Sequence, residues 1–206
     1  MKMIKIRNGM FSTNTYLIGN ENEWCYVIDP SDSFNRIKNY IDEQFGAKIK
    51  AILLTHGHLD HVGSVDRLVD IYNCPVYLSD NDKMYIDGSL RTYRNNLEEF
   101  NIQLKCNTID AYLINDPNIV VYETPGHTPG SVCYLFKNEN SIFVGDTLFK
   151  TSVGRTDLTG GSRKDLEKSL KILVKLPDNT NVYCGHEGDT TMDLKKFITL
   201  FWNKIL

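Results

Sequence analysis

The feature that most constrains this chain is the segment THGHLDHVG, residues 55–63, which directly follows a short apolar run. In an extended segment alternate side chains point the same way, so His56 and His58 can meet one ion at the end of a strand. Asp60 and His61 follow where the chain turns into a helix, and they can face another ion. A polar surface turn is the alternative, and it is disfavoured because closely packed imidazoles repel when protonated and gain little without a cation.

The two remaining histidines occur in a similar local context. His127 in TPGHTPGS and His186 in CGHEG each follow a glycine that comes after a short β-like run. Asp146 in SIFVGDT ends an apolar strand. Five histidines and two aspartates are therefore candidate metal ligands, and no cysteine is required: His56, His58, Asp60, His61, His127, Asp146 and His186.

Four motifs, HGHLDH, GHTPGS, VGDTLF and CGHE, occur in this order, and with them the chain resembles the metallo-β-lactamase superfamily, specifically its glyoxalase II-like hydrolases. The resemblance implies a two-metal site. It assigns one ion to His56, His58 and His127, and the other to Asp60, His61 and His186, with Asp146 bridging the two. It also implies that Asp29 in VIDP supports the metal-binding loop without binding metal itself.

The reaction implied by this resemblance is hydrolysis by a hydroxide that bridges the two metals. Such a site cleaves a thioester such as S-D-lactoylglutathione, or a related ester or lactone, without a Ser or Cys nucleophile. Asp146 is expected to act as the bridge and Asp60 to help move the proton to the leaving group. Zinc is the preferred metal, with iron and manganese as alternatives, because the ligands are nitrogen and oxygen atoms.

Three further hypotheses stay open or are disfavoured. A mononuclear iron persulfide dioxygenase is the main alternative, since that family shares the HxHxDH frame and the GRTD run. A redox or binding module without catalysis is disfavoured by His58, where diiron relatives carry glutamate. A true β-lactamase is disfavoured by Asp146, where those enzymes commonly have Cys or Ser.

The sequence also contains candidate residues for a substrate pocket. Arg155, in the run LFKTSVGRTDLTGGS, is predicted either to bind a substrate carboxylate or to pair with Asp157 in a tight turn. Gly188 stands where glyoxalase II usually has a tyrosine near the substrate. The sequence ends at Leu206, so we expect a short form without the C-terminal helical domain that helps to hold glutathione.

The pattern of apolar residues agrees with the fold that the resemblance implies, a four-layer αββα sandwich of the α/β class. We expect a single domain over residues 1–206, with the ligands at strand ends along one edge. The strands are predicted at residues 3–7, 15–19, 24–29, 49–54, 119–122, 132–136 and 141–144, and the helices at 33–46, 60–72, 163–174 and 193–202. The segment Ser79–Thr108 breaks this regularity; a helical surface excursion is favoured there over a substrate lid.

Composition and charge argue against nucleic-acid and membrane partners, so we expect a small-molecule substrate. A net charge of −3 provides no basic surface for nucleic acid. No apolar run approaches the roughly twenty residues that a membrane span needs, and the start lacks the apolar region of a signal peptide, so we expect a cytoplasmic protein without a membrane partner. Assembly into a homo-oligomer is also compatible with the sequence.

The five cysteines include no CxxC pair and are expected to be reduced, with Cys184 packed in a strand.

Overall fold

The computed structural model describes residues 1–8, 11–94 and 98–194, and the chain divides into two compact units, residues 1–114 and 115–206. Each unit contains one five-stranded sheet. The single domain stays a prediction, because two compact units can belong to one domain or to two domains that fold separately.

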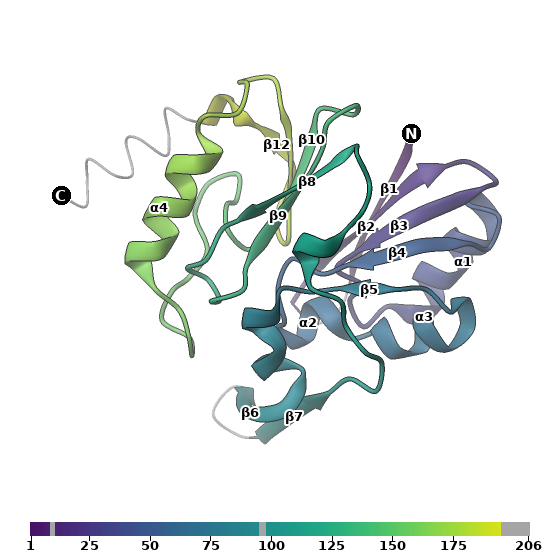
Figure 1. Ribbon diagram of the computed structural model, residues 1–206, viewed down its shortest axis with the longest axis horizontal. Coiled ribbons are helices and arrows are strands. Elements are labelled where there is room, and N and C mark those ends of the chain that lie inside the picture. Colours follow the sequence, from purple (N-terminus) through teal and green to yellow (C-terminus); the bar gives the residue numbers. More distant parts are fainter. Residues whose placement is uncertain (9–10, 95–97, 195–206) are drawn as a thin grey trace. The chain divides into compact units, whose positions relative to one another are not determined.

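The first unit is built on a mixed sheet whose strands follow one another in chain order (Figure 1). The strands are β1 (Lys2–Asn8), β2 (Thr13–Asn20), β3 (Trp24–Ile28), β4 (Ile49–Leu53) and β5 (Val76–Tyr77). The first three run antiparallel, whereas β4 lies parallel to β3 and β5 parallel to β4. Parallel neighbours need a crossover, which the helices α1 (Phe34–Gln44) and α3 (Val65–Tyr72) supply.

Both helices pack on the same sheet through their apolar faces. Ile37 and Ile41 of α1 and Leu68 of α3 are fully buried in one cluster with strand residues such as Leu17 and Ile52. The spacing of these helical residues by three to four positions matches one face of an α-helix, as the sequence predicted for residues 33–46. The strands of this unit that were predicted from alternation and apolar runs are confirmed.

The single helix predicted over residues 60–72 is wrong, because the chain forms α2 (Leu59–Val62) and then α3. The backbone N–H of Ser64 donates to the carbonyl of Pro30 (3.0 Å) instead of to a carbonyl one turn earlier. Gly63 passes so close to Asp32 that an added Cβ would lie 3.0 Å from its backbone nitrogen. The break therefore results from contacts with the loop after β3, which helical periodicity does not show.

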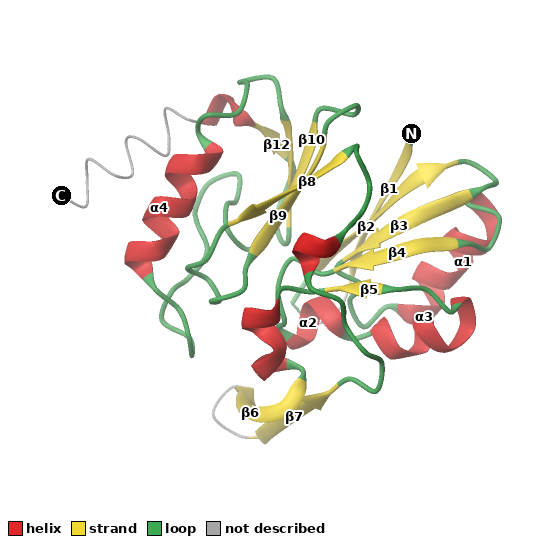
Figure 2. Cartoon of the chain, in the orientation of Figure 1, coloured by secondary structure: helices red, strands yellow, loops and turns green. Residues whose placement is uncertain are grey.

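The segment Ser79–Thr108 also differs from the prediction of a helical excursion. It forms the 3-10 turn η1 (Asp80–Tyr85) and then a separate antiparallel hairpin of β6 (Asp87–Arg94) and β7 (Glu98–Gln103) (Figure 2). Hydrogen bonds between the two strands here take the place of those expected within a helix. A short turn, η2 (Ala111–Leu113), closes the first unit.

The second unit repeats the plan of the first. Its strands β8 (Ile119–Glu123), β9 (Val132–Phe136) and β10 (Ser141–Gly145) run antiparallel, and α4 (Arg163–Leu173) crosses over to the parallel strand β11 (Asn181–Cys184). The short strand β12 (Thr190–Thr191) and the turn η3 (Met192–Leu194) follow. The predicted strands and the helix at 163–174 are confirmed.

The α4 helix covers one face of this second sheet. Leu166, Leu170 and Leu173 are buried in a cluster that also contains Ile142 and Cys184 from the strands. The helix begins after Ser162, whose hydroxyl accepts the backbone N–H of Asp165 as an N-cap. The helix predicted at 193–202 lies almost wholly outside the described residues. Within the described ranges no helix has the length and apolar character needed to cross a bilayer.

Candidate metal centre

Sheet topology brings the candidate ligands of the first unit to one edge. The parallel strands β3 and β4 pair Ile28 with Leu53, so their carboxyl ends leave the sheet side by side. Asp29 follows the first strand, and the loop that contains His56 and His58 follows the second. Loops at the carboxyl ends of parallel strands commonly hold functional side chains, because both strands position them rigidly.

Within this loop the side chains form two adjacent pairs. The rings of His56 and His58 lie 4.8 Å apart between centroids, in an edge-to-face arrangement. His61 places its Nε2 atom 3.5 Å from Oδ2 of Asp60. These are the pairs that the sequence assigned to the first and second ion. His56 and His61 are buried, whereas His58 and Asp60 are half-buried.

Asp29 organises this loop through three hydrogen bonds. Thr55 donates its backbone N–H to Oδ1 (2.8 Å) and its hydroxyl to Oδ2 (2.7 Å). His61 Nδ1 lies 3.0 Å from the same Oδ2. The side chains of Asp29, His56 and His61 each offer an atom within 4.8 Å of the others. Because both carboxylate oxygens already accept protein hydrogen bonds, the geometry favours the supporting role predicted for Asp29 over direct metal binding.

In the second unit a single carboxylate oxygen lies between two histidines. The parallel strands β10 and β11 end together, with Gly145 paired to Cys184, and Asp146 and His186 follow them. Oδ2 of Asp146 lies 3.3 Å from Nε2 of His186 and 3.6 Å from Nε2 of His127. The Asp146 side chain is only 11% exposed.

The loop after β10 supports both Asp146 and His127. Gly154 passes so close that an added Cβ would lie 1.8 Å from the carbonyl oxygen of Asp146, so only glycine fits without displacing the backbone. The next residue, Arg155, places its carbonyl oxygen 2.8 Å from Nδ1 of His127. This loop therefore fixes the ring of one candidate ligand and the backbone of another.

The Arg155 side chain pairs with Asp157 through two hydrogen bonds of 2.7 Å. Hydrogen bonding to Arg155 lowers the pKa of Asp157 to about 2. The predicted pairing of Arg155 with Asp157 is thus confirmed. Both side chains are largely exposed. A contact between Arg155 and a substrate carboxylate stays a prediction.

Three of the histidines are held in a form suited to metal binding. A carbonyl oxygen can only accept, so His127 must donate from Nδ1 to Arg155 and carry its lone pair on Nε2. The Asp29 carboxylate likewise accepts from Nδ1 of His61, so this ring also carries its proton on Nδ1 and its lone pair on Nε2. The Thr55 hydroxyl gives its proton to Asp29 and lies 3.1 Å from Nδ1 of His56, from which it can accept. Metal-bound histidines characteristically donate their other ring N–H in this way.

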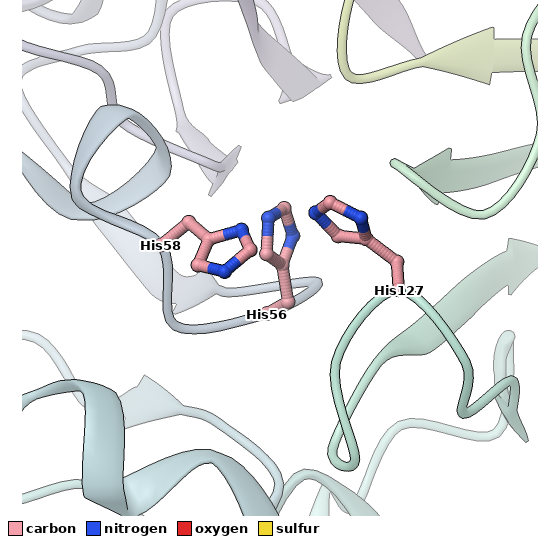
Figure 3. Close-up of side chains that lie close together, drawn as sticks. All are labelled: His56, His58 and His127. Atoms are coloured by element: carbon pink, nitrogen blue, oxygen red, sulfur yellow. The ribbon is translucent and has the colours of Figure 1, made fainter. Parts of the chain in front are cut away.

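Figure 3 shows His56 and His58 on the loop after β4, and His127 on its own loop after β8, with the rings turned away from the backbone that carries them. The donor set is made of imidazole nitrogens and carboxylate oxygens, which suits zinc, iron and manganese. On this ground the residues of both units fit the divalent metals that the sequence predicted.

Two supporting contacts were not found from the sequence. Thr13 donates its hydroxyl to Oδ2 of Asp60 (2.7 Å). Asp82 accepts the backbone N–H of Gly57 (2.9 Å), which lies between two candidate ligands. Each partner lies in another element, 47 or 25 positions away along the chain, and no local pattern marks either residue.

Comparison with known proteins identifies the family. The metallo-beta-lactamase superfamily model matches residues 8–186, and the chain belongs to this superfamily. The chain is 33% identical to the probable metallo-hydrolase YqgX of Bacillus subtilis over 92% of each protein. It is 35% identical to a hydroxyacylglutathione hydrolase of Pelagibacter ubique, over 78% of this chain and 60% of that enzyme.

Solved structures give the same result for the fold. The chain superimposes on the BLEG-1 B3 metallo-beta-lactamase with a TM-score of 0.82 and 31% identity, over 96% of this chain and all of the other. For TTHA1623 in a di-iron-bound form the TM-score is 0.79 at 33% identity, with coverage of 94% and 96%. The predicted fold class, an α/β sandwich of the metallo-β-lactamase type, is confirmed. The findings also support the coarser functional prediction, a metal-dependent hydrolase of this superfamily.

The structure allows a prediction for Cys184, which is fully buried in the core under α4. No disulfide joins any of the five cysteines. Cys184→Ser should keep kcat/KM within about twofold, because the thiol packs against apolar side chains. It should also lower the free energy of unfolding by about 1–3 kcal/mol, the cost of burying a poorly paired hydroxyl. Kinetics and thermal unfolding measure the two effects; a large loss of activity in folded protein would contradict this packing role.

Proposed function

We propose that the protein is a binuclear metal-dependent hydrolase that cleaves a thioester such as S-D-lactoylglutathione, or a related ester or lactone. The observation that carries the proposal is the position of Asp146. Its Oδ2 atom lies within 4 Å of Nε2 of both His127 and His186, the two histidines assigned to different ions. A carboxylate in that position is suited to bridge two cations.

The proposed ligands come from both units. His56, His58 and His127 would hold one ion, and Asp60, His61 and His186 the other. When bound, such ions lower the pKa of a shared water and polarise a carbonyl group. Zinc is the proposed metal, with iron or manganese as alternatives, and the di-iron form of the similar protein TTHA1623 supports a site for two metals.

The protein residues would orient the ligands and handle protons. Asp29, the Thr55 hydroxyl and the Arg155 carbonyl hold Nδ1 of His61, His56 and His127, respectively. Asp60 would carry a proton toward the leaving group. Its Oδ2 accepts the Thr13 hydroxyl, which keeps the carboxylate oriented. These contacts therefore hold the nitrogen and oxygen atoms of the candidate ligands in fixed orientations.

Thioester hydrolysis is proposed on the similarity to the Pelagibacter hydroxyacylglutathione hydrolase. Among the described residues, an added Cβ at Gly188 would meet only Lys150, at an ordinary 3.8 Å. Without an aromatic side chain at position 188, fewer contacts are available to a glutathione tail. Lactones and simple esters therefore belong in the same substrate set.

The test is metal analysis of protein purified without chelators, combined with a substrate panel. We expect close to two ions per chain, because seven candidate ligands exceed what one tetrahedral ion can use. We also expect hydrolysis of lactoylglutathione or of a simpler thioester with the same acyl group. At most one ion per chain after metal supplementation, together with oxygen uptake on a glutathione persulfide, would replace this proposal by the persulfide dioxygenase alternative.

A further inference from the structure

The 3-10 turn η1 packs directly against the loop that holds His56 and His58. Asp82, in this turn, is fully buried, and its Oδ2 accepts the backbone N–H of Gly57 at 2.9 Å. A hydrogen bond between a buried carboxylate and a backbone N–H is stronger than one between neutral groups. The peptide between the two histidines is therefore held by a buried carboxyl group from another element.

A second residue of η1 touches the same loop. Tyr85 is buried, and an added Cβ on Gly57 would lie 2.8 Å from Cβ of Tyr85 and 3.0 Å from the carbonyl oxygen of Asp82. The loop thus passes the turn at a distance that only glycine permits. The Tyr85 ring also meets the His58 ring edge to face, with centroids 5.1 Å apart and planes at 83°.

These contacts act on three consecutive residues of the loop. Gly57 is the only residue between His56 and His58, so the orientation of its two peptide bonds decides where both imidazoles point. Glycine has no preferred backbone conformation of its own, and a loop centred on it needs outside contacts to stay in one state. Asp82 holds the backbone, and Tyr85 limits the rotation of the His58 ring.

We propose that Asp82 and Tyr85 are positioning residues that orient His56 and His58 for metal binding. The inference rests on the metal-binding role proposed for these histidines. It also assigns a role to the beginning of the segment Ser79–Thr108, because η1 supports the loop that contains His56 and His58. Neither residue needs to touch the metal or the substrate for this effect.

Asp82→Ala tests the proposal, with Asp80→Ala as the matched control. Asp80 lies in the same turn, but its side chain is 52% exposed and pairs with Lys83. The measurements are the Kd for Zn²⁺ in competition with a chromophoric chelator and the visible spectrum of the Co²⁺-loaded protein. We expect Asp82→Ala to weaken metal binding by about 10–100-fold and to change the Co²⁺ spectrum, as the loss of a partner behind a ligand typically does. Asp80→Ala should match the wild type in both.

Three further variants keep the test decisive if Asp82→Ala does not fold. Asp82→Asn retains an oxygen that can accept the Gly57 N–H and should recover most of the metal affinity. Tyr85→Ala should weaken metal binding, whereas Tyr85→Phe, which keeps the ring, should not.

A purely structural role would lower the melting temperature of the metal-free variants and leave Kd and spectrum unchanged, and that result would overturn the inference. A wild-type protein that binds no Zn²⁺ or Co²⁺ would instead overturn the proposed function itself, so the two failures are distinguishable.

Discussion

Asp146→Ala is expected to lower turnover by about 10³-fold, because the charge stabilisation that bound metals provide is worth several kcal/mol and each factor of ten needs about 1.4 kcal/mol. It should also lower the occupancy of both ions. The physical reason is that one oxygen of Asp146 lies close to Nε2 of both His127 and His186. Without the carboxylate, less negative charge would lie between the two neighbouring cations, so their mutual repulsion would increase. Elemental analysis and steady-state kinetics on the same preparation measure both effects.

Two controls separate the bridge from an ordinary ligand. His186→Ala should mainly empty one metal site and leave the other occupied. Asp157→Ala removes an exposed carboxylate that pairs with Arg155, and it should keep both ions. If Asp146→Ala retained two metals and full activity, Asp146 would not be the bridge, and the ligand assignment of the second unit would have to change.

Asp29→Ala is expected to destabilise the fold and also weaken metal binding. Its carboxylate accepts two hydrogen bonds from Thr55 and contacts Nδ1 of His61. Each buried donor left without an acceptor costs about 1–3 kcal/mol, so we expect a loss of at least about 3 kcal/mol in the free energy of unfolding. Asp29 also has a left-handed backbone, with φ of +48°, and alanine there should add roughly 1 kcal/mol of strain. Chemical denaturation of the metal-free protein measures the total.

Asp29→Asn is the matched variant for this position. Asparagine tolerates the left-handed conformation and offers one oxygen, so most of the stability should return. Its amide cannot accept at both positions, and His61 should lose the partner that fixes its proton on Nδ1. We therefore expect near-normal stability with weaker metal binding. If Asp29→Ala lowered the free energy of unfolding no more than Asp32→Ala, a change at an exposed neighbour, the Asp29 network would not support the loop.

Much of the fold could be predicted because it depends on local patterns. Apolar runs and alternation identified the main strands of both units, and spacing by three to four residues identified α1 and α4. The break between α2 and α3 could not be predicted in this way. It depends on a hydrogen bond from Ser64 to Pro30, more than thirty positions away. The hairpin of β6 and β7 was missed for a similar reason, since strand pairing decides it.

The chemistry of the candidate site could be predicted from the sequence. The residue types, their order and the glycines beside them identified all seven candidate ligands and the superfamily, because metal binding needs particular donor atoms at strand ends. The residues that hold those donor atoms in place are seen only in the folded chain. Asp29, the carbonyl of Arg155 and Asp82 reach the ligand loops from distant parts of the chain. These contacts form because the residues come close together in the folded chain. The spacing of residues along the sequence does not predict them.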